Sequence, residues 1–132
     1  MNQKKDKPPT ILIFELDDDT RPLLKYNLSI WGYHVIEALQ EEDAIALARG
    51  VRDRPSLILI NQFKIPIDET INMGRRICQG AELPNTTPIV VMAERYGPDM
   101  EGKDVKISES EYVTYLEDGE QLMNLLYCLC PV

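Results

Sequence analysis

The chain has 132 residues, of which 44% are hydrophobic and 27% charged, and its formal charge at pH 7 is −8. This length and composition are typical of one globular domain. The negative charge opposes binding to a phosphate backbone, so we expect no contact with nucleic acid. The apolar runs are far shorter than the roughly 20 residues that cross a bilayer, so we expect no membrane segment.

The cysteines point to a reducing compartment. Their number is odd, and Cys128 and Cys130 are separated by a single residue, which matches neither a disulfide framework nor a metal-ligand spacing. We therefore expect a cytoplasmic protein without a leader segment. Cys78, Cys128 and Cys130 lie on helical patterns, where a free thiol packs as a small apolar side chain.

Strand and helix patterns alternate along the chain. Residues 1–9 are polar, end in Pro8-Pro9 and are expected to form a flexible tail, which leaves 10–132 as the domain. Continuous apolar runs and helical spacings predict strands at 10–14, 33–38, 57–60, 89–92 and 112–115, and helices at 19–31, 41–51, 71–80 and 120–129. Gly97, Pro98 and Gly102 weaken any helix before the last strand.

This alternation predicts an α/β fold. Right-handed crossovers between parallel strands place helices on both faces of the sheet. Five strands favour the flavodoxin-like doubly wound order 2-1-3-4-5. Because ligands in such folds bind at the carboxyl ends of the strands, the informative residues are those that follow strands one, three, four and five.

Several motifs occur in the order and spacing of one family. The segments at 11–21, 26–28 and 31–38, followed by 54–61, Pro66, 75–77, 88–92 and 111–114, resemble the receiver domain of two-component response regulators. The resemblance covers residues 10–130. It implies phosphoryl transfer to an aspartate at the end of strand three, with magnesium held by acidic residues after strand one.

Most positions of the implied phosphorylation site carry other residues here. The acceptor position is Asn61, whose amide cannot attack phosphorus to form an acyl phosphate. Glu15 matches one paired acid, but Leu16 replaces the second and supplies no oxygen for magnesium. Ala93 replaces the hydroxyl after strand four, and Tyr115 replaces the lysine after strand five. We therefore expect no phosphoryl transfer, no enzymatic activity and no cofactor.

The remaining site positions allow two interpretations. Tyr112 matches the switch aromatic of the family, while Leu16, Ala93 and Tyr115 are expected to fill the pocket with apolar groups. The acidic run 17–19 is expected mainly to cap the first helix. An alternative is a weak cation site made of Glu15, Asp17 and the Phe63 carbonyl. His34 is expected to be structural, on a strand near the sheet edge.

Three functions compete. The first is a receiver-like signalling module that needs no phosphorylation and binds a histidine kinase, an output domain or another signalling protein, or forms a homodimer. The resemblance implies the face formed by helix four, strand five and helix five for these contacts. The second is a small-molecule or cation sensor that uses the crevice after strands one and three. The third is an active phosphoacceptor that uses Asp17 or Asp68, which the missing lysine and hydroxyl disfavour.

Overall fold

The computed structural model describes residues 7–50, 52 and 54–132. The strands are β1 (Thr10–Phe14), β2 (His34–Ala38), β3 (Leu57–Asn61), β4 (Ile89–Met92), β5 (Asp104–Ser108) and β6 (Glu111–Thr114). The helices are α1 (Thr20–Ile30), α2 (Glu41–Ala48), α3 (Ile67–Gly80) and α4 (Gly119–Leu129). Among the described residues, no helix is long and apolar enough to span a bilayer.

The sheet has the order β2-β1-β3-β4-β6-β5. The first four strands are parallel and follow the predicted order, and β6 pairs parallel with β4, as expected of the last core strand. The residues of β1 are buried along its whole length because other strands flank it and helices cover both faces. The carboxyl ends of β1, β3, β4 and β6 therefore lie together at one end of the sheet.

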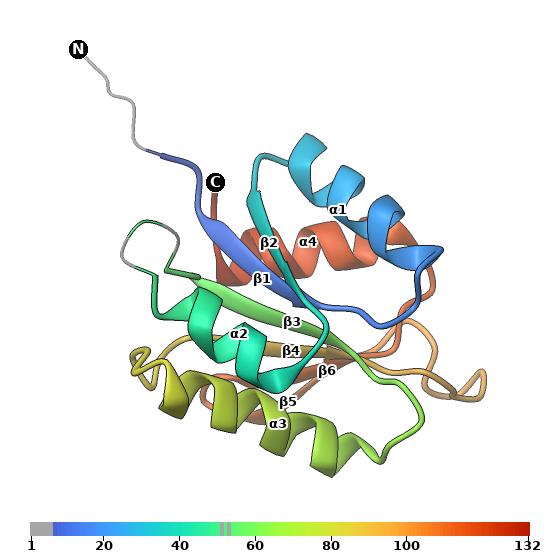
Figure 1. The fold of residues 1–132 in the computed structure, drawn as a ribbon. Coiled ribbons are helices and arrows are strands. Elements are labelled where there is room, and N and C mark those ends of the chain that lie inside the picture. Colours follow the sequence, from blue (N-terminus) through green and yellow to red (C-terminus); the bar gives the residue numbers. More distant parts are fainter. Residues whose placement is uncertain (1–6, 51, 53) are drawn as a thin grey trace.

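Helices cover both faces of this sheet, as predicted. Helices α1 and α4 lie on one face, and α2 and α3 lie on the other (Figure 1). Each face has its own apolar core, with Leu28 and Leu126 on the α1 and α4 side and Ala44 and Ile77 on the α2 and α3 side. Gly74 allows α3 to lie close to β4, since a Cβ at this position would lie 2.7 Å from Cγ2 of Ile89.

The region between β4 and β6 differs from the prediction. The expected sheet had five strands, but β5 adds a sixth that pairs antiparallel with β6 as a hairpin. No helix forms from residue 93 to 110, all of which are described. Gly97 and Pro98 disfavour a helix there, as expected, but the alternation of polar and apolar residues in Asp104–Ser108 was a strand signal that the prediction missed.

The end of α2, the position of His34 and the burial of the cysteines agree only in part with the sequence prediction. Helix α2 ends at Ala48 and not at Val51, which lies outside the described residues together with 1–6 of the expected tail. The end strand β2 carries the exposed His34, as expected. Cys78 and Cys130 are buried and burial raises the pKa of both thiols, that of Cys78 to about 11. The expectation of apolar packing is wrong for Cys128, which is exposed because it lies on the outer side of α4.

Helix α4 begins with a side-chain cap. The Asp118 carboxylate accepts a hydrogen bond of 2.9 Å from the Gln121 amide nitrogen. The Gln121 side chain in turn accepts one from the backbone nitrogen of Glu117, at 2.8 Å. The reciprocal bonds use backbone donors that helix geometry leaves unpaired, so they fix where α4 starts.

An ion pair between the half-exposed Arg75 and the buried Glu111 fastens α3 to the start of β6. The Arg75 guanidinium donates two hydrogen bonds to the two oxygens of the Glu111 carboxylate, one of them at 2.7 Å. The Glu111 side chain is only 8% exposed, and its pKa is lowered chiefly by these bonds from Arg75. Because the pKa of Glu111 is lower in the folded state, the pair stabilises the fold at pH values above the ordinary pKa of a glutamate. This contribution is lost as the pH falls through the lowered pKa.

We predict that Arg75→Ala will lower the free energy of unfolding by about 2 kcal/mol at neutral pH, because it leaves the buried Glu111 carboxylate without its charged partner and with only the hydroxyl bond from Ser108. Urea denaturation measures this loss. The control is Arg76→Ala, which removes the neighbouring, more exposed pair with Glu41 and should cost much less. Equal losses in the two variants would contradict a structural role for Glu111.

Candidate functional site

The acceptor position and the retained acid bond each other directly. Asn61 ends β3, and its side-chain amide donates to Oε1 of Glu15 at 2.8 Å and to Oε2 at 2.9 Å. Glu15 follows β1, and its side chain has no exposed surface. The carboxylate also accepts a bond of 3.2 Å from the Asp17 backbone nitrogen. Both carboxylate oxygens of Glu15 are thus used within the protein.

The acidic run after β1 forms the turn into α1. The Asp17 carboxylate accepts from the backbone nitrogen of Thr20 at 2.8 Å and from its hydroxyl, and these bonds are the main cause of the lowered pKa of Asp17. Asp17 therefore caps the start of α1, as expected of the acidic run 17–19, whereas Asp19 makes no side-chain cap bond. Arg21, which the sequence did not single out, donates to the Glu15 carbonyl at 2.9 Å.

Leu16 does not fill the pocket as predicted. Its side chain is 37% exposed, because the neighbouring Glu15 takes the inward position at the end of β1. The prediction was wrong because Leu16 lies after the end of β1, where strands and helices no longer cover the side chains on all sides. An isobutyl group at this place neither packs in the core nor offers an oxygen ligand.

Ala93 and Tyr115 follow β4 and β6, and both are partly buried against the core on the α2 and α3 side. The Tyr115 ring meets the Tyr96 ring edge to face, with centroids 5.4 Å apart. The Tyr96 hydroxyl donates to the Leu116 carbonyl and so ties the loop after β4 to the end of β6. For these two positions the structure agrees with apolar packing.

Tyr112, which the sequence predicts to match the switch aromatic, lies in the middle of β6. It is partly buried and packs against the core on the α1 and α4 side, opposite to the side of Val113. Its register partner on β4 is Val90, and Lys106 is its partner on β5. Tyr112 is therefore flanked on both sides by strands of the same sheet.

Two further residues connect the loops after β3 and β4. The Gln62 side chain donates to the Ile65 carbonyl at 2.8 Å and accepts from the Glu94 backbone nitrogen at 2.8 Å. The Glu94 carboxylate accepts from the backbone nitrogen of Lys64 at 2.9 Å. Sequence reasoning missed this bridge, although both residues directly follow site positions, Asn61 and Ala93, and have side chains long enough to cross between loops.

No protein-family model matches the chain. A curated relative, the transcriptional regulatory protein AfsQ1 of Streptomyces coelicolor, is 30% identical over 87 residues, which cover 66% of this chain and 36% of the relative. The chain thus spans about a third of the length of the curated relative that it matches.

Solved structures match nearly the whole chain. A response regulator of Thermotoga maritima is 22% identical, has a TM-score of 0.65, and the match covers 92% of this chain and 97% of the other. The chemotaxis protein CheY4 of Vibrio cholerae is 17% identical with a TM-score of 0.67, over 92% and 98% of the two chains. The fold is that of a response-regulator receiver domain.

The receiver fold places the predicted site residues where the carboxyl ends of the strands meet. Glu15, Asn61, Ala93 and Tyr115 follow or end β1, β3, β4 and β6, and Glu15 and Asn61 are in direct contact. Asp68 lies in the first turn of α3, and its carboxylate accepts from the Glu69 backbone nitrogen.

Cation binding would have to compete with the internal hydrogen bonds of this receiver fold. The carboxylates of Glu15 and Asp17 already accept from backbone and side-chain donors. Within the described part of the chain, no three His, Cys, Asp or Glu side chains are arranged to hold a metal ion.

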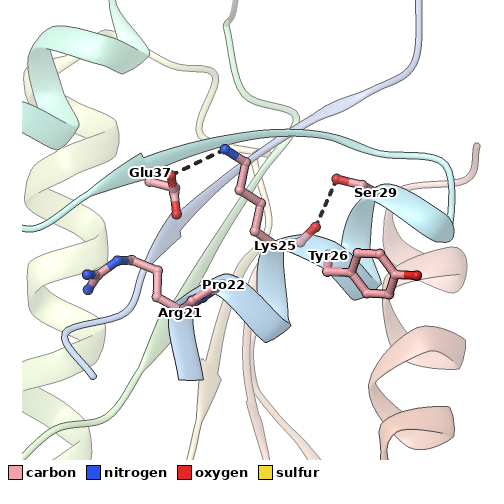
Figure 2. A pocket seen from close by; sticks show the side chains of 6 residues that line it. All are labelled: Arg21, Pro22, Lys25, Tyr26, Ser29 and Glu37. Atoms are coloured by element: carbon pink, nitrogen blue, oxygen red, sulfur yellow. Dashed lines mark hydrogen bonds and ion pairs between the residues drawn. The ribbon is translucent and has the colours of Figure 1, made fainter. Parts of the chain in front are cut away.

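A shallow groove lies beside the site, between α1 and β2. It has a volume of about 480 Å³, and Figure 2 shows Lys25 reaching from α1 across it toward Glu37 of β2. Their charged groups are 3.4 Å apart. Arg21 at one end of the groove is the residue that bonds the Glu15 carbonyl. The groove is open, and the charged residues that line it already form ion pairs, which does not indicate a particular ligand.

We predict that Asn61→Asp will lower the free energy of unfolding by about 2 kcal/mol at pH 7, because it replaces the donor to a buried carboxylate with a second carboxylate. Two close carboxylates raise the pKa of the pair above its unfolded value, so the native state binds more protons. The loss should therefore shrink as the pH falls toward 5.

Urea denaturation at several pH values measures the effect of Asn61→Asp. Asn85→Asp, at an exposed loop position, is the control for adding one negative charge. A loss in Asn61→Asp that stays constant between pH 7 and pH 5 would contradict the direct contact between position 61 and Glu15.

Proposed function

We propose that this chain is a receiver-like signalling module of two-component signal transduction that acts without phosphorylation, as a binding module and not as an enzyme. The observation that carries the proposal is the pair formed by Asn61 and Glu15. Asn61, at the acceptor position, donates two side-chain hydrogen bonds to Glu15, the acid that would help to hold magnesium. An amide in this role offers no nucleophilic carboxylate.

The bridge between the loops supports a fixed conformation. In the receiver family, the resemblance implies that the hydroxyl after strand four contacts the phosphoryl group carried at the end of strand three, which links the loops after these two strands. Here the side chains of Gln62 and Glu94 join the same two loops through bonds of 2.8 and 2.9 Å. Because the two loops are already joined when no ligand is bound, a ligand has no second state to favour.

The position of the missing lysine supports the same interpretation. Tyr115 packs on Tyr96 and against the core, so its side chain contributes to the stability of the loop. A tyrosine cannot supply the positive charge that pairs with a phosphoryl oxygen. The site is therefore better suited to hold its own loops than to hold an anion.

For the partner, we propose a protein of the same signalling system, such as a histidine kinase or an output domain. The expected face of helix four, strand five and helix five has a different composition here, because the hairpin of β5 and β6 takes the place of a fourth helix beside α4. Contacts would thus involve strand β5 and helix α4. The curated relative is described as a transcriptional regulator, which supports a role in signalling.

A cation or small-molecule sensor is the alternative function. It would use the same crevice after β1 and β3, where Glu15 and Asp17 supply the acidic groups. Their hydrogen bonds to Asn61 and Thr20 favour the first proposal, because a ligand would have to break them before binding.

We predict that the chain will take no phosphoryl group from a small phosphodonor in the presence of magnesium, because Asn61 lacks the nucleophile and Leu16 the metal ligand. Mass spectrometry of the intact protein is the measurement. An unchanged mass is expected, and an adduct that hydroxylamine removes would reveal an aspartyl phosphate and overturn the proposal.

We predict further that Asn61→Asp alone will not restore labelling by the phosphodonor. The second acid and the cation would still be absent, so Leu16→Asp and Tyr115→Lys should be needed as well. Labelling rates of the single and triple variants are compared by the same mass measurement. If the single variant labels as fast as the triple one, the losses do not act together.

A further inference from the structure

The edge strand β5 has backbone N–H and C=O groups that point away from β6, along the open side of the sheet. It is the last strand in the sheet order, so only one of its sides pairs with a described strand, β6. The Tyr115 nitrogen donates to the Lys103 carbonyl at 2.8 Å, and Val105 faces Val113. Because bonded and non-bonded positions alternate in an antiparallel ladder, Asp104 and Lys106 direct their N–H and C=O groups outward.

The side chains at these two positions have opposite charges. Asp104 and Lys106 are two residues apart, so both lie on the face of the sheet that α4 covers. The Asp104 carboxylate is held in place there by bonds from Thr114 at 2.7 Å and Gln121 at 2.9 Å. The Lys106 side chain is 55% exposed and its ammonium lies 3.2 Å from the Glu109 carboxylate, a surface contact that is easily exchanged.

With Asp104 and Lys106 on either side of Val105, the edge of β5 is complementary to the edge of a second copy of β5. If a second β5 strand approaches antiparallel with Val105 opposite Val105, Asp104 of each copy faces Lys106 of the other. In this register the outward backbone groups of Asp104 meet those of Lys106, which is the bonded arrangement. The partly exposed Val105 side chains come together on the opposite face.

We propose that two copies of this chain pair through antiparallel contact of their β5 strands, which joins their sheets into one. The contact uses the edge that the hairpin creates and needs no phosphoryl group. It does not depend on the proposed signalling function, because a receiver fold that takes up phosphate could pair in the same way. The short contact and the charge of −8 on each copy oppose tight association, so we expect a weak, concentration-dependent dimer.

The test combines sedimentation with amide hydrogen exchange followed by NMR, on the full chain over a range of concentrations. The amide of Val105, which pairs with β6, should exchange slowly at every concentration. The outward amides of Asp104 and Lys106 should exchange quickly in dilute protein and slow down as the dimer forms.

Charge reversal tests the register. Lys106→Glu places two like-charged pairs across the contact and should weaken association about tenfold. Adding Asp104→Lys to the same chain restores opposite charges and should recover the dimer. Lys25→Glu on α1 is the matched control, since Lys25 has similar exposure and also pairs with an acid, and it should leave association unchanged. Circular dichroism checks that each variant remains folded.

A monomer at all concentrations would overturn the proposal, and so would a dimer whose protected amides lie elsewhere. Protection of Asp104 and Lys106 only after another protein is added would identify a different partner and would also overturn pairing between copies.

Discussion

The two hydrogen bonds from the Asn61 amide to the Glu15 carboxylate set the character of the whole site. Glu15 is fully buried, and a buried carboxylate needs donors to offset its lost hydration. In this receiver fold the donors come from the acceptor position and from the turn that starts α1. The same bonds that stabilise Glu15 therefore join β1 to β3 and hold α1 at the end of the sheet where receiver chemistry would take place.

The second constraint is the hairpin that follows β4. Gly97 and Pro98 disfavour a helix, and the chain returns as β5 to pair with β6. Tyr96 and Tyr115 fasten the start of this hairpin to the site, and Asp104 fastens its edge to α4. The site and the outer edge of the sheet are thus joined by one short, hydrogen-bonded segment. The surface beside α4 consequently presents a strand edge.

The sequence predicted the central fold because strand and helix periods are strong where both faces are buried. Strands β1, β3 and β4 are continuous apolar runs, and their order followed from the alternation with helices. Strand β5 was missed because an exposed edge strand has no continuous apolar signal. For the site, residue types predicted which groups were absent, but not the bonds that replaced them. The bridge between Gln62 and Glu94 depends on how two loops approach, and Leu16 points outward because Glu15 takes the inward position.

The most direct test of a fixed module follows Tyr112 by NMR while magnesium and beryllofluoride, the stand-in for an aspartyl phosphate, are added. In a working receiver, the switch aromatic and the last helix would change environment together. We expect the resonances of Tyr112 and of α4 to stay unchanged and Tyr112 to keep one rotamer. Large shifts that reach Tyr112 and α4 would demonstrate a working switch and contradict the account.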